Sequence, residues 1–559
     1  MITMNSATNP FVDRLLLHFK ERPEQIFCRL IGSDGETVLR WRDLDLLAHR
    51  FMTAYRRADL VPGDEILIFI RHRSELYGSF FGAMLGGFVP SFMPCTSPRQ
   101  EPGIYWSSHQ LLLERTRPAA IVADHVTFSE MLQAGLDLGS IQRIELEELG
   151  SASEIASPQA ESSIGLLQHS SGTTGLKKGV ALSYSAIVGQ LESYAAAIEA
   201  SQSDVVVSWL PLYHDMGLMA CCLMPAYLGI PIVHIDPFIW VARPELLLDA
   251  LVDHHGTLAW LPNFAFDHMA LVAGRRAADY DLSRVRAFIN CSEPCKPASF
   301  DRFAKAFAPA GVRPDQLQCC YAMAETVFAV SQTCIGAPAQ RIRVDAKALE
   351  RGQPVRLTAQ GQGGTELLET GLPLPEIDVA IYDEDRQLLP NPYIGEIGVR
   401  APFLFTGYNK DPARTAERLV GGTYFTRDLG FVLDGHVYVL GRIDDLIIVN
   451  GRNLYAHEVE AVIGDISGLK PGRTVAVALF DARIGSEALV VISERQRASV
   501  RQEAELRRDI MRTIYSTFEV TPWRVHIVEE GWLIKTTSGK ISRTENLARI
   551  QRAGAKEVT

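Results

Sequence analysis

Residues 170–179 read Ser-Ser-Gly-Thr-Thr-Gly-Leu-Lys-Lys-Gly, a composition suited to binding phosphate. Glycine lets the backbone close around an oxyanion, and successive backbone N–H groups can form an anion-binding concavity. The hydroxyl and lysine side chains add hydrogen-bond donors and positive charge. The simplest ligand for such a loop is a nucleoside triphosphate, and the alternative is a flexible Gly/Ser/Thr turn.

The segments that flank this loop distinguish it from a Walker A motif. Apolar runs lie on both sides of it, at residues 164–167 and 180–182. A Walker A loop leads directly into a helix, whereas residues 180–182 indicate a strand. A helical pattern over residues 184–200 begins only after Ser183, whose side chain suits the N-cap position. We therefore predict a phosphate-binding loop between two strands.

A histidine beside an aspartate follows the apolar run at residues 208–212. Residues 213–217 read Tyr-His-Asp-Met-Gly. His214, next to Asp215 at a predicted strand end, could serve acid–base chemistry or bind the carboxylate side of a substrate. A structural histidine is the alternative interpretation.

A tyrosine and a glutamate follow a second apolar run, at residues 317–320. Residues 321–326 read Tyr-Ala-Met-Ala-Glu-Thr. The Tyr321 ring at a strand end can stack on a base, and the hard oxygens of Glu325 can hold Mg²⁺. The alternative is a buried tyrosine and a surface glutamate.

Two acidic turns lie further along the chain. Asp428 occupies a turn in residues 424–430, where a carboxylate can accept both hydroxyls of a ribose. The alternative is an aspartate that caps its own turn. Residues 441–445 read Gly-Arg-Ile-Asp-Asp, which suits an exposed hinge or an ordinary turn.

A lysine on a glycine-containing loop lies near the end of the chain. Residues 535–541 read Lys-Thr-Thr-Ser-Gly-Lys-Ile. Such a loop can deliver Lys540 to a distant phosphate as a point charge, and a solvated basic turn is the alternative.

Length and composition restrict the class of protein. A chain of 559 residues predicts about three or four structural units. The net charge of −11, without a basic block, argues against a nucleic-acid partner. Nine cysteines and no recognisable secretory leader favour reduced thiols in a cytoplasm.

Two apolar stretches, residues 77–95 and 218–235, approach the length of a membrane span. Both contain proline or glycine, so we predict that they form buried α/β core. The cysteines at 221–222, 291 and 295, and 319–320 lack the spacing of a zinc site and are expected to be small core residues.

Strand-like and helical patterns alternate through the first 330 residues, which indicates mostly parallel sheets covered by helices. Residues 336–400 are expected to form an irregular insertion followed by a strand-rich piece. A last unit is expected to begin near Asp444. The expected strands are 65–70, 119–123, 205–210, 232–235, 287–290, 446–449, 475–480 and 489–493, and the expected helices are 41–57, 244–254, 299–308 and 500–518.

The order of these motifs resembles that of the adenylate-forming superfamily of acyl-CoA synthetases, adenylation domains and luciferases. The resemblance extends from about Phe11 to Arg549. The details look most like the fatty acyl-AMP ligases, because residues 208–218 and the Pro-Asn-Phe-Ala segment at 262–265 match that branch. The spacer after Glu325, with an insertion at roughly 336–370, is longer than CoA ligases have and is thought in that branch to restrict domain movement.

The sequence departs from the family pattern at several positions. Ala322 replaces a usual glycine, and Lys177 replaces a usual proline. Residues 291–294 read Cys-Ser-Glu-Pro where Gly-Ala-Glu-Pro is usual, and residues 238–244 differ from the branch. These departures leave ATP use intact and leave the acid substrate open.

The resemblance implies an α/β fold in two domains. Residues 1–443 would form a large domain of mostly parallel sheets, covering helices and a β-barrel-like part, and residues 444–559 a small mobile α+β domain. It implies an AMP-forming ligase that uses ATP and Mg²⁺ to convert a carboxylic, fatty-type acid into acyl-AMP. The acyl group would pass to the phosphopantetheine thiol of an acyl carrier protein, and transfer to CoA by an acyl- or aryl-CoA ligase is the alternative. Neither a nucleic-acid partner nor a membrane span is expected.

The resemblance also implies roles for individual residues. Lys540, His214 and Glu325 would be catalytic, Glu325 and Thr173 would lie at the metal, and Asp444 would be the hinge. Tyr321 would stack on adenine, Asp428 and Arg442 would hold the ribose, and Lys540 would bridge the substrate carboxylate and the α-phosphate. The implied nucleotide contacts are Ser170, Ser171, Gly172, Thr173, Thr174, Gly175, Lys178, Ser292, Glu293, Pro294, Tyr321, Ala322, Asp428 and Arg442.

Overall fold

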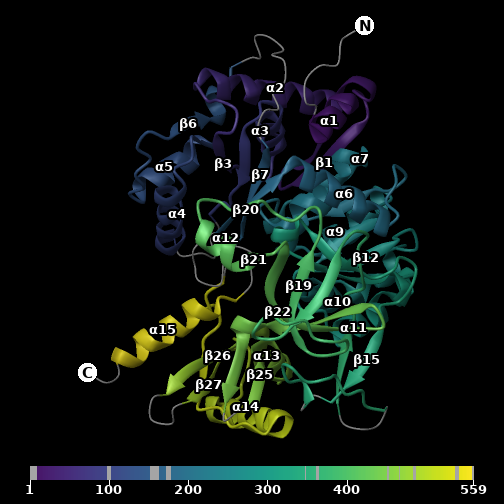
Figure 1. Cartoon of the computed structure of the whole chain (residues 1–559), viewed down its shortest axis with the longest axis vertical. Helices are drawn as coiled ribbons and strands as arrows, with labels where there is room; N and C mark the ends of the chain where they lie inside the picture. Colours follow the sequence, from purple (N-terminus) through teal and green to yellow (C-terminus); the bar gives the residue numbers. More distant parts are fainter. Residues whose placement is uncertain are drawn as a thin grey trace.

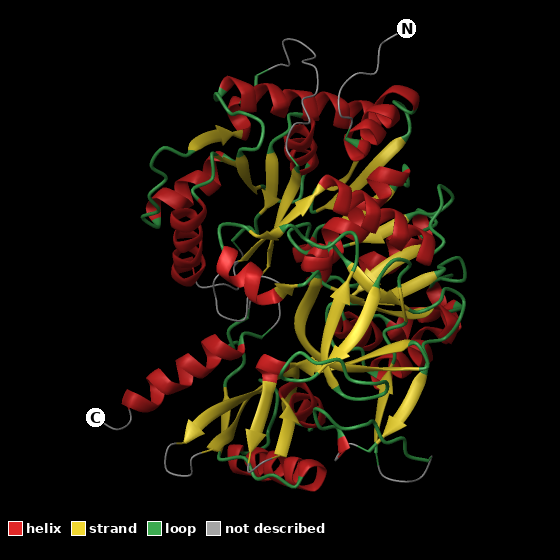
Figure 2. Ribbon diagram, in the orientation of Figure 1, coloured by secondary structure: helices red, strands yellow, loops and turns green. Residues whose placement is uncertain are grey.

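The computed structural model describes residues 9–96, 102–150, 163–170, 178–345, 348–359, 364–449, 452–464, 466–481, 486–535 and 541–556. Sheets covered by helices make up the first part of the chain, and antiparallel strands dominate the later part (Figure 1, Figure 2).

A nine-stranded sheet with the order β17-β14-β13-β12-β11-β9-β10-β1-β2 forms the centre of the molecule. The pairs from β13 through β12, β11, β9 and β10 to β1 are parallel, and the outer strands are antiparallel. Strands β9 to β12 are buried along their whole length, as expected for a parallel sheet with both faces covered. The bounds are β17 Leu372–Pro373, β14 Ala329–Gln332, β13 Leu317–Ala322, β12 Ala287–Asn290, β11 Leu258–Leu261, β9 Val206–Ser208, β10 Ile232–Ile235, β1 Ile26–Gly32 and β2 Gly35–Arg40, with helices α1 Pro10–Glu21, α6 Tyr184–Ala197, α9 Glu245–Asp253, α10 Asn263–Val272 and α11 Pro297–Phe307.

A second, four-stranded parallel sheet has the order β4-β3-β5-β6 and lies at the upper left of Figure 1. Helices α2 and α3 pack closely beside it, because a Cβ on Gly82 would lie 2.5 Å from the carbonyl oxygen of Ala48. The bounds are β4 Val89–Phe92, β3 Glu65–Phe69, β5 Ala120–Ala123, β6 Gln142–Glu145, α2 Trp41–Arg57, α3 Ser74–Leu85, α4 Pro102–Thr116 and α5 His125–Gln133.

Both apolar stretches that approach the length of a membrane span contribute to the buried core, as predicted. The first stretch forms α3 and β4, and the second ends in β10. Within the described ranges, no helix is both long and apolar enough to cross a bilayer.

The flanks of the candidate phosphate loop form an antiparallel pair, β7 (Ile164–Ser170) and β8 (Lys178–Ser183), which confirms the predicted strand–loop–strand arrangement. Residues 171–177 lie outside the described ranges. The Ser183 hydroxyl accepts from the Ala186 amide at 3.1 Å and caps α6, as predicted. The helix ends at Ala197, before the expected residue 200, because Glu199 adopts a φ of 52°.

Antiparallel strands from the later part of the chain pack beside this pair. β20 pairs with β8, and a five-stranded sheet contains β18, β19, β22, β21 and β23. The bounds are β18 Asp378–Tyr382, β19 Gly395–Arg400, β20 Gly407–Tyr408, β21 Leu419–Val420, β22 Thr423–Leu433 and β23 His436–Arg442.

The segment expected to be an irregular insertion contains a β-hairpin, so that part of the expectation was wrong. β15 (Arg341–Val344) pairs with β16 (Thr365–Leu368). Arg341 also donates to both carboxylate oxygens of Asp301 on α11, at 2.7 and 3.1 Å. Hairpin pairing and this bidentate contact fix a segment whose clustered Gly, Pro and Gln had suggested irregular structure.

Residues from β24 onward have hydrophobic cores of their own, distinct from the core of the nine-stranded sheet, and occupy the bottom of Figure 1. Helix α14 starts at Glu503 rather than 500, because the Glu505 carboxylate accepts from the Gln502 amide in a capping box. The bounds are β24 Leu446–Val449, β25 Arg452–Tyr455, α13 Ala456–Gly464, β26 Leu469–Asp481, β27 Ser486–Arg495, α14 Glu503–Phe518, β28 Arg524–Val528 and α15 Arg543–Lys556.

Arg543, the first residue of α15, connects this helix to two other parts of the chain. Its guanidinium lies 2.9 Å from Asp445 Oδ2 and 2.9 Å from Glu460 Oε2. We predict that Arg543→Ala lowers the free energy of unfolding by about 2–3 kcal/mol, since two largely buried carboxylates lose their partner. Chemical denaturation of the whole chain measures this change.

The matched control is Arg507→Ala, which removes an exposed i,i+4 ion pair with Glu503 on α14. It should cost about 0.5 kcal/mol or less. Equal losses for the two variants would contradict the structural role given to Arg543.

Candidate active site

The end of β13 carries two of the predicted site residues, Tyr321 and Glu325. The turn between them and β14 is tight: Val327 has a φ of 64°, and the Met323 amide donates to the Phe328 carbonyl at 2.9 Å. Tyr321 is 8% exposed, and its hydroxyl donates to Asp428 Oδ2 at 2.6 Å. The strand end is thereby joined to a residue far along the sequence.

Asp428 and Arg442 face each other across β22 and β23, where they are register partners. Arg442 Nε lies 3.3 Å from Asp428 Oδ1. Burial raises the pKa of Asp428, and the positive charge of Arg442 opposes this shift. Burial also raises the pKa of Tyr321, with Asp428 adding to it, so the hydroxyl keeps its proton and remains a donor.

Glu325 lies at the other end of the same cluster. Tyr408 donates its hydroxyl hydrogen to Glu325 Oε1 at 2.7 Å, and the Phe405 amide donates to the Glu325 carbonyl at 2.8 Å. Tyr408 is the partner of Val180 on β8, so the strand that leaves the phosphate loop lies beside this glutamate. Glu325 also interacts electrostatically with both Asp428 and Arg442. The two ends of the cluster therefore form one site.

Lys178, the first described residue after the phosphate loop, points toward this end of the site. Its Nζ lies 5.9 Å from the centroid of the Tyr408 ring. Burial lowers the pKa of Lys178, and nearby arginines, Arg414 foremost, lower it further. Such an environment favours an anionic ligand that neutralises the ammonium.

His214 lies in a turn tied to the same strand pair. Gln168 of β7 donates to the Tyr213 carbonyl at 2.8 Å, and the His214 ring meets the Tyr213 ring at 4.7 Å. A Cβ on Gly217 would lie 2.3 Å from the Pro211 carbonyl oxygen, so this close turn requires glycine. Asp215 accepts from the Met216 amide at 2.8 Å, which gives its carboxylate a helix-capping role.

The segment 292–294 follows β12 at the neighbouring strand end. Ser292 has a φ of 68°. Glu293 Oε2 accepts from the Phe264 amide at 3.0 Å in the first turn of α10. The Glu293 side chain therefore stabilises the first turn of α10, and the nucleotide contact predicted for the backbone of 292–294 stays a prediction.

Two further predicted residues, Ala322 and Asp444, are described. Ala322 is the last residue of β13. Asp444 lies at the junction after β23, where its Oδ1 accepts from Arg427 Nε at 3.1 Å. The predicted residues outside the described ranges are Ser171, Gly172, Thr173, Thr174, Gly175 and Lys540, and nothing is described of the Ser170 side chain.

Two contributors to the site were missed by sequence reasoning, Tyr408 and Gln168. Each reaches a predicted residue from a distant part of the chain, and neither stands within a recognisable polar motif. The glycine that precedes Tyr408 was the one local hint, because glycine is typical of a turn. The pairing of this segment with β8 could not be read from it.

The end of β13, the Asp428–Arg442 pair and the strand that leaves residues 171–177 meet at one place of an α/β fold, as expected for an adenylate-forming protein. The chain belongs to the AMP-binding enzyme family, whose model matches residues 17–409. The predicted α/β fold and the predicted family are thereby confirmed.

Named relatives and a solved structure agree with this family. The chain is 30% identical to the long-chain-fatty-acid–AMP ligase FadD26 of Mycobacterium marinum, over 88% of each chain. It is 29% identical to the 4-hydroxyphenylalkanoate adenylyltransferase of the same organism, over 94% of this chain and 88% of that one. A structure from work on fatty acyl-adenylate ligases of E. coli and L. pneumophila superimposes with a TM-score of 0.88 at 25% identity, covering 98% of both chains.

We predict that adenosine binding weakens as the pH falls through the raised pKa of Asp428, because ribose hydroxyls donate best to the ionised carboxylate. Adenosine carries no phosphate, so phosphate titration does not contribute. Calorimetry across the acid range measures the dependence. In Asp428→Asn, adenosine should bind more weakly at neutral pH, and the loss of affinity at acid pH should disappear. An unchanged loss of affinity at acid pH would contradict ribose binding by Asp428.

Proposed function

We propose that this chain is an ATP-dependent ligase that converts a carboxylic, fatty-type acid into acyl-AMP and then passes the acyl group to a carrier-protein thiol. The observation that carries the proposal is the single cluster in which Glu325 joins the Tyr321–Asp428–Arg442 contacts to the β8 strand of the phosphate loop. Its similarity to a long-chain-fatty-acid–AMP ligase supports the acid class.

In the first step a carboxylate oxygen attacks the α-phosphorus of ATP. The bond from that phosphorus to the bridging oxygen breaks, and its electrons leave with pyrophosphate. Chemistry of this kind depends on positioning and charge neutralisation. Tyr321 would hold the adenine, Asp428 and Arg442 the ribose, and the loop 170–178 the leaving phosphates.

Glu325 is the residue that would hold Mg²⁺. Among the described residues no cluster of three metal-ligating side chains occurs. Mg²⁺ bound mainly through substrate phosphates needs only one or two carboxylates, so a single glutamate with Oε2 available fits. When bound, the ion would offset phosphate charge, and Thr173 would lie near it.

The part of the chain from residue 444 onward is proposed to be a small domain that rotates about Asp444. Its separate hydrophobic cores and the Arg427–Asp444 contact at the junction support this view. In one orientation Lys540 would bridge the substrate carboxylate and the α-phosphate. In the second orientation Lys540 would withdraw, and the acceptor thiol could enter. His214 would lie near the acyl carboxylate.

We predict that Lys540→Ala lowers carboxylate-dependent ATP–pyrophosphate exchange by at least about 100-fold, because a charge that stabilises the transition state is lost. Thioester formation from preformed acyl-AMP should continue. Measuring both half-reactions on one preparation tests the role, and equal loss of the two would refute it.

A carrier protein is favoured over CoA as the acceptor. The hairpin β15–β16, held on α11 by Arg341, gives the insertion a fixed place from which to restrict domain movement. The second candidate is an acyl- or aryl-CoA ligase. A 29% identical relative is named for an aromatic acid, so aryl acids are retained as candidate substrates. A cytoplasmic location is part of the proposal, and it is supported by nine free cysteines.

The acceptor is tested by incubating the protein, ATP and a fatty acid with either CoA or a holo carrier protein. We expect thioester on the carrier and little acyl-CoA. Rapid acyl-CoA formation would instead establish the CoA ligase. A pyrophosphate-release screen over fatty, short branched and aryl acids identifies the substrate class.

A further inference from the structure

Two cations lie beside the ring of Tyr408, the residue that hydrogen-bonds Glu325. Lys178 Nζ is 5.9 Å and Arg414 Cζ is 6.0 Å from the ring centroid. Lys178 comes from β8 and Arg414 from helix α12 (Pro412–Arg418). The pairing of β20 with β8 brings these distant segments together.

The charges of these two side chains are poorly neutralised by the protein. No carboxylate of the described residues forms an ion pair with Lys178, and Glu325 acts on it only at longer range. The ion pair of Arg414 is a 3.8 Å contact with Asp411, the N-cap of its own helix. Arg414 is also the strongest of the charges that lower the pKa of Lys178, after burial itself. Like charges held together at a partly buried place favour a polyanionic ligand.

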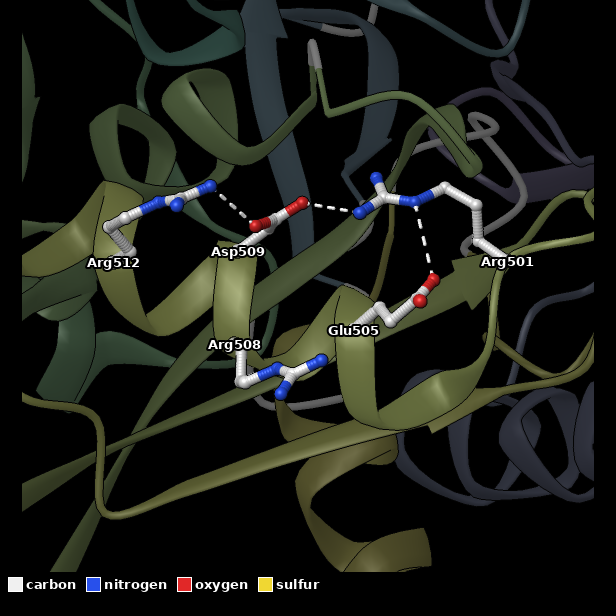
Figure 3. Close-up of a pocket in the computed structure, with 5 residues that line it drawn as sticks. All are labelled: Arg501, Glu505, Arg508, Asp509 and Arg512. Carbon is white, nitrogen blue, oxygen red and sulfur yellow. Dashed lines mark hydrogen bonds and ion pairs between the residues drawn. The ribbon is translucent and has the colours of Figure 1, made fainter.

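Another group of arginines in the molecule differs in this respect. Arg501, Arg508 and Arg512 line a surface hollow of about 530 Å³ on α14, together with Glu505 and Asp509 (Figure 3). Asp509 pairs there with Arg501 and with Arg512, at 2.5 and 2.6 Å. Short contacts with Asp509 neutralise Arg501 and Arg512 there, whereas Arg414 has only the 3.8 Å contact with Asp411 and no described carboxylate forms an ion pair with Lys178.

We propose that Arg414 is a further catalytic residue, which together with Lys178 binds the β- and γ-phosphates of ATP and the pyrophosphate that leaves. This proposal rests on the proposed function. The planar guanidinium can bind two phosphate oxygens at once, and it lies 6.0 Å from the ring centroid of Tyr408, whose hydroxyl donates to Glu325. As the bond to the α-phosphorus breaks, negative charge moves to the pyrophosphate, where both cations stabilise it.

Calorimetry with two probes tests the proposal. Inorganic pyrophosphate with Mg²⁺ reports the β,γ-phosphate positions, and AMP reports the base, ribose and α-phosphate positions. In Arg414→Gln we expect about tenfold weaker pyrophosphate binding, because a charge-assisted contact is lost, and AMP affinity within about twofold of the unchanged protein. Arg414→Lys keeps the charge but loses the planar guanidinium. Its pyrophosphate affinity should lie between those of the unchanged protein and Arg414→Gln.

Arg512→Gln is the matched control, since it removes the same charge from the exposed cluster on α14, where Arg512 is 78% exposed. It should leave both affinities unchanged. Undiminished pyrophosphate binding in Arg414→Gln would overturn the proposal, and so would an equal loss of AMP affinity or an equal effect of Arg512→Gln. Retained AMP binding also shows that the variant is folded.

These measurements need neither an acid nor an acceptor, so they remain decisive if the proposed acyl-AMP formation is refuted. If acyl-AMP formation holds, Arg414→Gln should also weaken product inhibition by pyrophosphate by about tenfold while leaving the KM for the acid within about twofold. A change confined to the KM of the acid would contradict the role.

Discussion

The buried carboxylate of Asp428, between the Tyr321 hydroxyl and the Arg442 guanidinium, is the interaction on which the site depends. A buried carboxylate is tolerated only when hydrogen bonds and an opposite charge compensate for lost solvation. Here the compensation comes from two directions, the end of β13 in the nine-stranded sheet and the register partner on β23. These contacts join the antiparallel part to the parallel sheet at the site, beside the apolar core that the two parts share.

Tyr408 makes the second connection. Its strand, β20, completes the β7–β8 pair that carries the phosphate loop, and its hydroxyl reaches Glu325 at the end of the main sheet. The strand that leaves the loop, Glu325 and the Tyr321–Asp428–Arg442 contacts therefore share one location. In the proposed function, ATP would lie across this location with its base and ribose at Tyr321 and Asp428 and its phosphates toward Lys178, so that binding would use both connections.

The last part of the chain is attached differently. It buries most of its apolar residues in clusters of its own, while Leu446 and Tyr455 pack against residues of β22 and β23 and Arg427 contacts Asp444 at the junction. Arg543 ties the start of α15 to Asp445 and Glu460, so the end of the chain follows the segment just after the junction. Interfaces between the domains of one chain commonly resemble transient interfaces, which suits a unit proposed to change orientation.

The sequence by itself determined the family and the alternation of strands and helices, because these depend on short motifs and on local periodicity, and the same motifs predicted candidate site residues. It predicted α2 over Trp41–Arg57 and the Ser183 cap of α6. Its errors lay where contacts distant in sequence outweigh local composition, as in the β15–β16 hairpin. Only the tertiary structure assigned Tyr408 and Gln168 to the site, gave the Glu293 side chain to α10, and brought Arg414 beside Lys178. Those placements come from strand pairing and burial between segments far apart in the chain, which no local pattern encodes.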